Sequence, residues 1–143
     1  MTHSILLVDD NKTDRYLLKR RLEKLSLDLT VLEAENGQVA LEMFNDYQTN
    51  NEENPTAYPP LVVFLDINMP ILDGFGFLEA FHHVGAPTDR ASPVVFMFTS
   101  SHREEDKARS MHWDFVKEYI VKGDLSNEKL EQIFEQHLKP TVC

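Results

Sequence analysis

The chain alternates between short apolar runs of strand length and longer segments in which apolar residues recur at helical spacing. Two of the runs are apolar throughout, as is typical of strands covered on both faces of a sheet. The runs predict strands at Ser4–Val8, Leu29–Ala34, Leu61–Leu65, Val94–Phe98 and Glu118–Val121. The periodic segments predict helices at Thr13–Leu25, Gly37–Tyr47, Phe75–Val84, Glu104–His112 and Ser126–Leu138.

Five β–α units with short connections indicate an α/β fold, a doubly wound parallel sheet with helices on both faces. Two polar segments that contain prolines, 50–60 and 87–93, are predicted to be surface loops. The 143 residues are enough for one domain with a substantial core, and no internal repeat is visible. We therefore expect a single domain over residues 1–143.

Reactive polar side chains stand where four of the predicted strands end. Asp9 and Asp10 follow the first strand, and Asp66 follows the third. Thr99 follows the fourth strand, and Lys122 follows the fifth. Ligands of open α/β sheets bind outside the carboxyl ends of the strands, so we expect these residues to share one edge of the sheet. Each alone is an ordinary turn former or strand end, but their joint placement favours a functional site.

This set of groups is suited to phosphoryl chemistry around a cation. Three neighbouring carboxylates raise one another's pKa unless a cation lies among them, and Mg²⁺ prefers a small number of hard oxygen ligands. A carboxylate can attack phosphorus while the cation neutralises phosphoryl oxygens. Lys122 can contact another phosphoryl oxygen, and the Thr99 hydroxyl can donate a hydrogen bond to the product phosphate.

Composition narrows the function classes further. With 14 Lys and Arg against 24 Asp and Glu, the formal net charge is −10, which disfavours nonspecific binding to nucleic acid or to an anionic membrane. The single cysteine, Cys143, leaves no internal disulfide and no CxxC site. No apolar run approaches the length of a membrane span, and no signal peptide pattern is visible. We expect a cytoplasmic protein that contacts neither nucleic acid nor membrane directly.

The motifs at the strand ends resemble those of response regulator receiver domains, in particular the chemotaxis regulators that consist of a receiver alone. The resemblance covers essentially the whole chain, and its motifs occur in the family's order. They are Val8–Asn11 for the acid pair, Leu65–Pro70 around the phosphoacceptor, Leu72–Gly74 opening the third helix, Phe98–Ser100 for the switch hydroxyl and Tyr119–Lys122 for the aromatic-to-lysine segment.

The resemblance implies a flavodoxin-like sheet of five strands in the order 2-1-3-4-5. It also implies that Asp66 is the phosphoacceptor and that Mg²⁺ is the cofactor. The implied metal ligands are Asp10, Asp66 and the main-chain carbonyl of Asn68. Asp9 would act mainly through a bound water.

The same resemblance implies roles for Thr99 and Lys122 in phosphorylation and for Thr99 and Tyr119 in a conformational switch. The implied phosphodonor is a sensor histidine kinase or a histidine phosphotransfer protein. The signal would pass to a downstream protein, and a second copy of the chain is a further candidate partner. Such a protein is not an enzyme in the usual sense, because it catalyses only its own phosphorylation and dephosphorylation.

The sequence departs from the family pattern beside two of these residues. Gly123 follows Lys122 where a proline is usual, and Ser100 follows Thr99 where alanine or glycine is common. The first departure bears on backbone geometry at the lysine, and the second bears on the dephosphorylation rate. Neither removes a required group.

Two alternatives from other functional classes remain open. An aspartyl-phosphate hydrolase of the haloacid dehalogenase type would use Asp9 as its nucleophile, but Asn11 then stands in place of the acid/base aspartate, and the Asp66 motif is unexplained. A binding module that works without phosphorylation would leave the Asp, Thr and Lys set without a purpose. Six basic residues crowd the first helix and are either a solvated face or a docking surface for a helical bundle that carries a histidine: Lys12, Arg15, Lys19, Arg20, Arg21 and Lys24.

Overall fold

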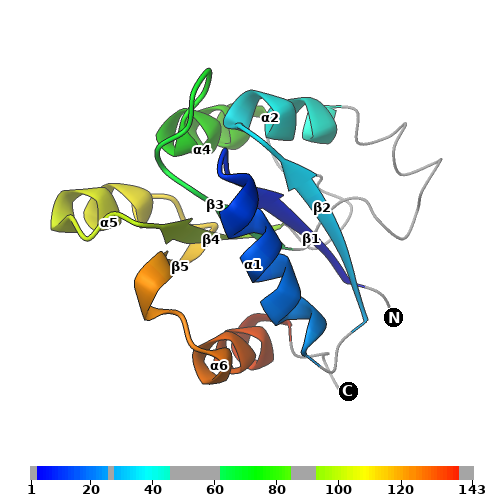
Figure 1. Ribbon diagram of the computed structural model, residues 1–143. Helices are drawn as coiled ribbons and strands as arrows, with labels where there is room; N and C mark the ends of the chain where they lie inside the picture. Colours follow the sequence, from blue (N-terminus) through cyan, green and yellow to red (C-terminus); the bar gives the residue numbers. More distant parts are fainter. Residues whose placement is uncertain (1–2, 26–27, 46–61, 85–92, 139–143) are drawn as a thin grey trace, which may run out of the picture.

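The computed structural model describes residues 3–25, 28–45, 62–84 and 93–138, and five strands in it form one parallel sheet in the order β2-β1-β3-β4-β5 (Figure 1). The strands are β1 (His3–Val8), β2 (Leu29–Ala34), β3 (Val62–Leu65), β4 (Val94–Thr99) and β5 (Val116–Val121). The helices are α1 (Lys12–Glu23), α2 (Gly37–Asn45), α4 (Gly74–Val84), α5 (Glu104–Ser110) and α6 (Asn127–Leu138), with a short 3-10 helix η1 (Lys122–Asp124). The predicted fold class and strand order are therefore confirmed.

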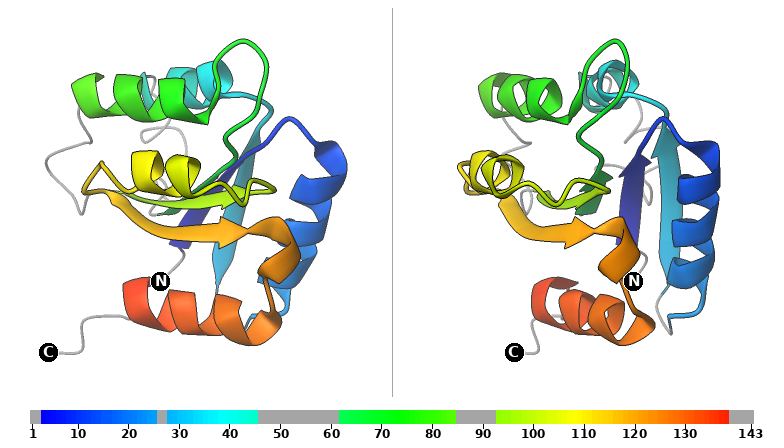
Figure 2. Two further views of the ribbon diagram at one scale, coloured as in Figure 1. Left: turned by 90° about the vertical axis from the view of Figure 1, so that its left-hand side faces the viewer. Right: turned by 60° about the vertical axis from the view of Figure 1, so that its left-hand side comes forward.

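Helices cover both faces of the sheet, with α1 and α6 on one side and α2, α4 and α5 on the other (Figures 1 and 2). Because successive side chains of a strand point to opposite faces, neighbouring residues of β1 enter different cores. Leu6 joins the core under α2 and α4, whereas Ile5 and Leu7 join the core under α1 and α6. This two-sided burial explains why β3 is apolar throughout and why β4 is apolar up to Thr99.

The strand register brings the carboxyl ends of β1 and β3 together. Val8 of β1 lies opposite Leu65 of β3, and the next residue of each strand extends the backbone ladder. Asp66 donates its backbone N–H to the Val8 carbonyl at 3.0 Å, and Asp9 donates its own to Ala34 of β2 at 3.1 Å. The backbones of Asp9 and Asp66 are thus fixed side by side at one edge of the sheet.

In the described ranges the observed boundaries differ from the predicted ones by at most two residues: α1 ends at Glu23 instead of Leu25, and the other two-residue differences lie around α5 and β5. The helix α5 ends at Ser110, two residues before the predicted end, and β5 begins at Val116, two residues before the predicted start. β5 is an edge strand of the sheet, and its exposed Lys117 separates the buried Val116 from the predicted strand, which is why the predicted start came too late. The predicted loop at 50–60 and residues 87–92 of the second predicted loop lie outside the described residues.

Within the described ranges, no helix combines the length and apolarity needed to cross a bilayer.

Candidate functional site

The acid pair after β1 is held by the turn that opens α1. The Asn11 side chain accepts the Asp14 N–H at 3.0 Å and so caps the helix, while the Asn11 N–H donates to Asp9 Oδ1 at 2.9 Å. Arg15 donates to the Asp9 carbonyl oxygen at 2.5 Å. These bonds hold the Asp9 side chain in a buried position, whereas Asp10 is exposed.

Asp66 lies at the end of β3 against the start of α4. It is only 7% exposed, and its Oδ1 accepts the Ile67 N–H at 2.8 Å. Gly74, the first residue of α4, donates its N–H to the Ile67 carbonyl at 2.8 Å and leaves no space for a side chain, because a Cβ would overlap the Asp66 carbonyl oxygen. Close packing of α4 on this turn therefore requires glycine at position 74.

The loop between β3 and α4 contains a strained residue. Ile71 has a φ of 70°, in the left-handed region that β-branched residues rarely adopt, and the Leu72 N–H donates to the Pro70 carbonyl across it at 2.8 Å. Asn68 lies earlier in the same loop and is exposed. The sequence carried no signal for this strain, since Ile71 is an unremarkable apolar residue there.

The Lys122 ammonium lies among three carboxylates. Its Nζ is 2.7 Å from Asp9 Oδ2, 2.8 Å from Asp14 Oδ2 and 3.3 Å from Asp66 Oδ2. Burial lowers the pKa of Lys122, but the hydrogen bonds to Asp14 and Asp9 and the charges of Asp66 and Asp9 outweigh it, so the pKa lies above its ordinary value. The lysine is therefore firmly cationic beside Asp66.

Three of the carboxylates form a group that fits a divalent cation. Asp9, Asp10 and Asp66 each offer an oxygen, and the three oxygens lie within 4.8 Å of one another. Burial raises the pKa of Asp9, hydrogen bonds from Lys122 and Asn11 offset part of this rise, and the charge of Asp66 adds to it. Clustered carboxylates of this kind supply the hard oxygen ligands that Mg²⁺ and Mn²⁺ favour.

Thr99 and Tyr119 are linked through a residue that the sequence analysis did not single out. Thr99 is fully buried at the end of β4, and its Oγ1 accepts the Ser101 N–H at 3.3 Å. Tyr119 on β5 is half-buried and donates its hydroxyl to the Ser101 carbonyl at 3.1 Å. Burial raises the pKa of Tyr119. Ser101 therefore carries one bond to each of the two residues.

The structure thus brings together four of the residues singled out from the sequence, namely Asp9, Asp10, Asp66 and Lys122. Thr99 and Tyr119 meet at Ser101, as described above. Asp14 was missed as a partner of Lys122. The only signal in the sequence was an acidic residue in the first turn of the helix that follows the acid pair.

A model of the family described as response regulator receiver domain matches residues 5–135. The chain is 39% identical to the chemotaxis protein CheY of Halobacterium salinarum over 111 residues, which cover 78% of each chain. It is 30% identical to the sensor histidine kinase CheAY of Helicobacter pylori over 94% of its own length. It spans only 15% of the length of that kinase and 11% of a hybrid histidine kinase of Dictyostelium discoideum.

Solved structures show the same architecture. A two component response regulator from Cytophaga hutchinsonii matches with a TM-score of 0.79 at 22% identity, over 95% of this chain and 96% of that one. The Mn²⁺-bound form of response regulator Rcp1 matches with a TM-score of 0.69 at 26% identity, over 99% of this chain and 97% of that one. At 22% identity, the likeness to the Cytophaga hutchinsonii regulator shows a shared fold alone.

Proposed function

The chain belongs to the response regulator receiver domain family, and we propose that it is a phosphate-accepting response regulator in which Asp66 takes a phosphoryl group from a phosphohistidine donor. One observation carries this proposal. An oxygen of the Asp66 carboxylate lies within 4.8 Å of one oxygen of each member of the acid pair, and the Lys122 ammonium is 3.3 Å from Asp66. An anionic phosphoryl group at Asp66 would therefore meet positive charge from the lysine and from any cation held by the acid pair.

In the proposed step an Asp66 carboxylate oxygen forms a bond to phosphorus while the bond from phosphorus to the donor's imidazole nitrogen breaks. The nitrogen keeps the electron pair, and the donor leaves with a neutral imidazole once it carries one proton. Water later attacks phosphorus, which releases inorganic phosphate and restores the Asp66 carboxylate. The chain therefore acts only on its own aspartate.

Asp9, Asp10 and Asp66 would hold the divalent cation, with the carbonyl of Asn68 as a further ligand. When bound, the cation neutralises phosphoryl oxygens and lowers the repulsion between phosphate and carboxylates. The Mn²⁺-bound form of the similar response regulator Rcp1 supports a divalent ion as the ligand of this cluster. We propose Asp10 as a direct ligand and Asp9 as a ligand that acts mainly through a bound water.

Lys122 and Thr99 would then stabilise the phosphorylated aspartate. The Lys122 ammonium needs only a small shift to move from the Asp66 carboxylate to a phosphoryl oxygen. Thr99 is fully buried at the end of β4, next to β3, and its hydroxyl currently accepts from the Ser101 N–H. Donation of this hydroxyl to the phosphate would draw it away from Ser101.

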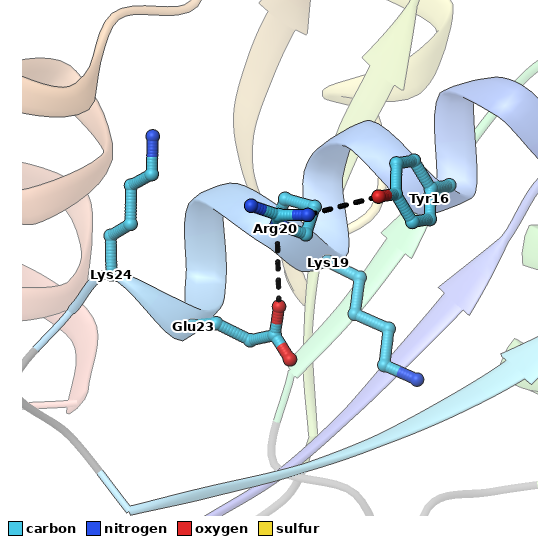
Figure 3. A pocket seen from close by; sticks show the side chains of 5 residues that line it. All are labelled: Tyr16, Lys19, Arg20, Glu23 and Lys24. Carbon is cyan, nitrogen blue, oxygen red and sulfur yellow. Dashed lines mark hydrogen bonds and ion pairs between the residues drawn. The ribbon is translucent and has the colours of Figure 1, made fainter.

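We assign donor docking to the exposed face of α1. Arg20 donates to the Tyr16 hydroxyl at 2.9 Å and pairs with Glu23 at 3.8 Å. Figure 3 shows both interactions, with Lys19 and Lys24 extending to either side of Arg20. Tyr16 is 54% exposed. A basic and apolar surface on an otherwise acidic protein fits a helical partner with acidic and apolar side chains.

The α1 face is also continuous with the phosphorylation site. A groove of about 360 Å³ between α1 and the start of α6 is lined by Leu17 and Arg20 of α1 and by Lys122. Replacing Arg20 by glutamate should slow transfer from a phosphohistidine protein while leaving labelling by acetyl phosphate unchanged, because the small donor needs no docking surface.

The experiment that tests the proposed function is measurement of intact mass after incubation with acetyl phosphate and Mg²⁺. The wild-type protein should gain one phosphoryl group, and EDTA should prevent the gain. Asp66→Asn should gain none, because the amide keeps the shape but is not a nucleophile. Asp73→Asn is the matched control, since Asp73 is a nearby exposed carboxylate that accepts the Gly76 N–H, a role that asparagine can also fill. Equal labelling of the Asp66 variant and the wild type would refute the assignment.

A further inference from the structure

Lys122 has one carboxylate partner that does not belong to the candidate cation site. Asp14 Oδ2 lies 2.8 Å from the Lys122 ammonium. The corresponding distances are 2.7 Å for Asp9 and 3.3 Å for Asp66. Asp14 and Lys122 are 108 positions apart in the sequence, so their pairing joins the first turn of α1 to the end of β5. The carboxylates close enough to share a cation are Asp9, Asp10 and Asp66, and Asp14 is not among them within the part of the chain that the structure describes.

We propose that Asp14 is a positioning residue that keeps the Lys122 ammonium beside Asp66 when a divalent cation occupies the acid cluster. This inference rests on the proposed function, because it concerns how Asp66 is phosphorylated.

The reason is that a bound cation changes which carboxylates remain free to pair with Lys122. Without it, Lys122 is the positive charge shared by Asp9, Asp14 and Asp66. A divalent ion held by Asp10 and Asp66, and by Asp9 through a water, competes with Lys122 for the Asp9 and Asp66 oxygens and repels the ammonium, because two cations within a few ångströms of each other are unfavourable. Asp14 remains wholly available to the lysine. It therefore anchors the ammonium at the site while its other two partners are shared with the cation.

The surroundings of Asp14 leave its carboxylate available for this task. The helix cap uses the backbone N–H of Asp14, which donates to Asn11, and does not use its side chain. The Lys122 side chain is only 16% exposed and that of Asp14 33% exposed, so the pair is shielded more than an ordinary surface ion pair. A carboxylate in the first turn also favours the helix electrostatically, and a useful test must separate that structural role from positioning.

The separating measurement is a double-mutant cycle on the rate of phosphorylation by acetyl phosphate at saturating Mg²⁺, with Asp14→Asn, Lys122→Met and both together. Asp14→Asn alone should lower the rate constant about three- to tenfold, and in the Lys122→Met background it should change the rate less than about twofold. Asp14→Glu should restore most of the rate. Glu42→Gln is the charge-matched control, because it removes one exposed carboxylate from α2 on the opposite face of the sheet and should leave the rate unchanged.

Each other outcome refutes a different statement. If Asp14→Asn is phosphorylated as fast as the wild type, positioning is wrong. If it loses the same factor with and without Lys122, Asp14 acts through the helix and positioning is again wrong. If the wild type itself takes up no phosphoryl group, the proposed function fails, and with it the reaction that this residue would assist. Melting curves of all variants confirm that rates are compared between folded proteins.

Discussion

At the scale of single residues, the site holds one lysine whose positive charge partly neutralises several neighbouring carboxylates. Lys122 lies near Asp9, Asp14 and Asp66, and these contacts hold its pKa above the ordinary value despite burial. The lysine does not fully offset the cost of ionising these carboxylates. The pKa of Asp9 is still raised, and burial is the largest cause. A metal-free cluster in which one carboxylate is unfavourably ionised is suited to bind a cation, since binding relieves the repulsion.

The pH dependence of stability follows from the position of Asp9. Its pKa is raised in the folded state, so the folded chain keeps a proton at pH values where the unfolded chain has released it, and stability falls as pH rises through that interval. Asp9→Asn should make this decline less steep in EDTA. Urea unfolding from about pH 4 to about pH 8 measures it, with Glu42→Gln as the control. An unchanged slope in the Asp9 variant would show that its ionisation is not penalised by folding.

The members of the site could be predicted from the sequence, but their pairing could not. Asp9, Asp66 and Lys122 each come directly after a strand, and parallel strands bring their carboxyl ends to one edge of the sheet. Asp14 stands in a helix, where an acidic residue in the first turn has an ordinary role. Its contact with Lys122 depends on where the first turn of α1 lies relative to the turn that follows β5, which no local pattern specifies.

At the scale of elements, the start of α4 determines the backbone position of Asp66. Gly74 donates to the Ile67 carbonyl, and the missing side chain allows the helix to approach the turn that follows β3. The position of α4 and the position of Asp66, the proposed phosphoacceptor, are therefore linked by the same contact. The edge strand β5 is the element that the sequence predicted least completely, since its exposed positions carry polar residues.

Replacing Gly74 by alanine should therefore both destabilise the fold and slow phosphorylation. The added Cβ would overlap the Asp66 carbonyl oxygen and lie 2.8 Å from the Ile67 Cα, both backbone atoms that cannot move aside cheaply. We expect a loss of about 1–3 kcal/mol in the free energy of unfolding, measured by urea denaturation. Gly123→Ala is the matched control, because nothing lies within 4 Å of a Cβ there, and its effect should stay within about 0.5 kcal/mol. Equal effects of the two substitutions would contradict this account.

At the scale of the whole molecule, two cores on opposite faces of the sheet support a site at its edge. The apolar runs in the sequence reflect this burial directly, which is why fold class and strand order were predictable. Ser101 joins Thr99 at the end of β4 to Tyr119 on β5, because it bonds to both. A turn residue of this kind has no pattern of its own, so the sequence could not indicate it.

Phosphorylation should change this surface through Ser101. If phosphate on Asp66 draws the Thr99 hydroxyl inward, the Ser101 N–H loses its acceptor, and the carbonyl that holds the Tyr119 hydroxyl moves with it. Hydrogen exchange with beryllofluoride, a mimic of the phosphoryl group, should show altered protection in residues 99–101 and 116–121. The same surface is then our proposed site for a downstream protein or a second copy of the chain.

Tyr119→Phe is the matched variant for this switch, because it keeps the ring and removes only the hydroxyl that bonds to Ser101. It should still bind beryllofluoride but transmit a smaller change to β5. Changes confined to the Asp9, Asp10 and Asp66 pocket in the wild type would contradict the switch.

The most direct test of the central claim is to locate the phosphorylated carboxylate chemically. Borohydride reduces an acyl phosphate to an alcohol, so an aspartyl phosphate is recovered as homoserine and can be placed by peptide mass spectrometry. After incubation with acetyl phosphate and Mg²⁺, we predict homoserine at position 66 and at neither position of the acid pair. Homoserine at Asp9 would favour the hydrolase alternative, and recovery of Asp66 unmodified from a protein that has gained a phosphoryl group would contradict the account.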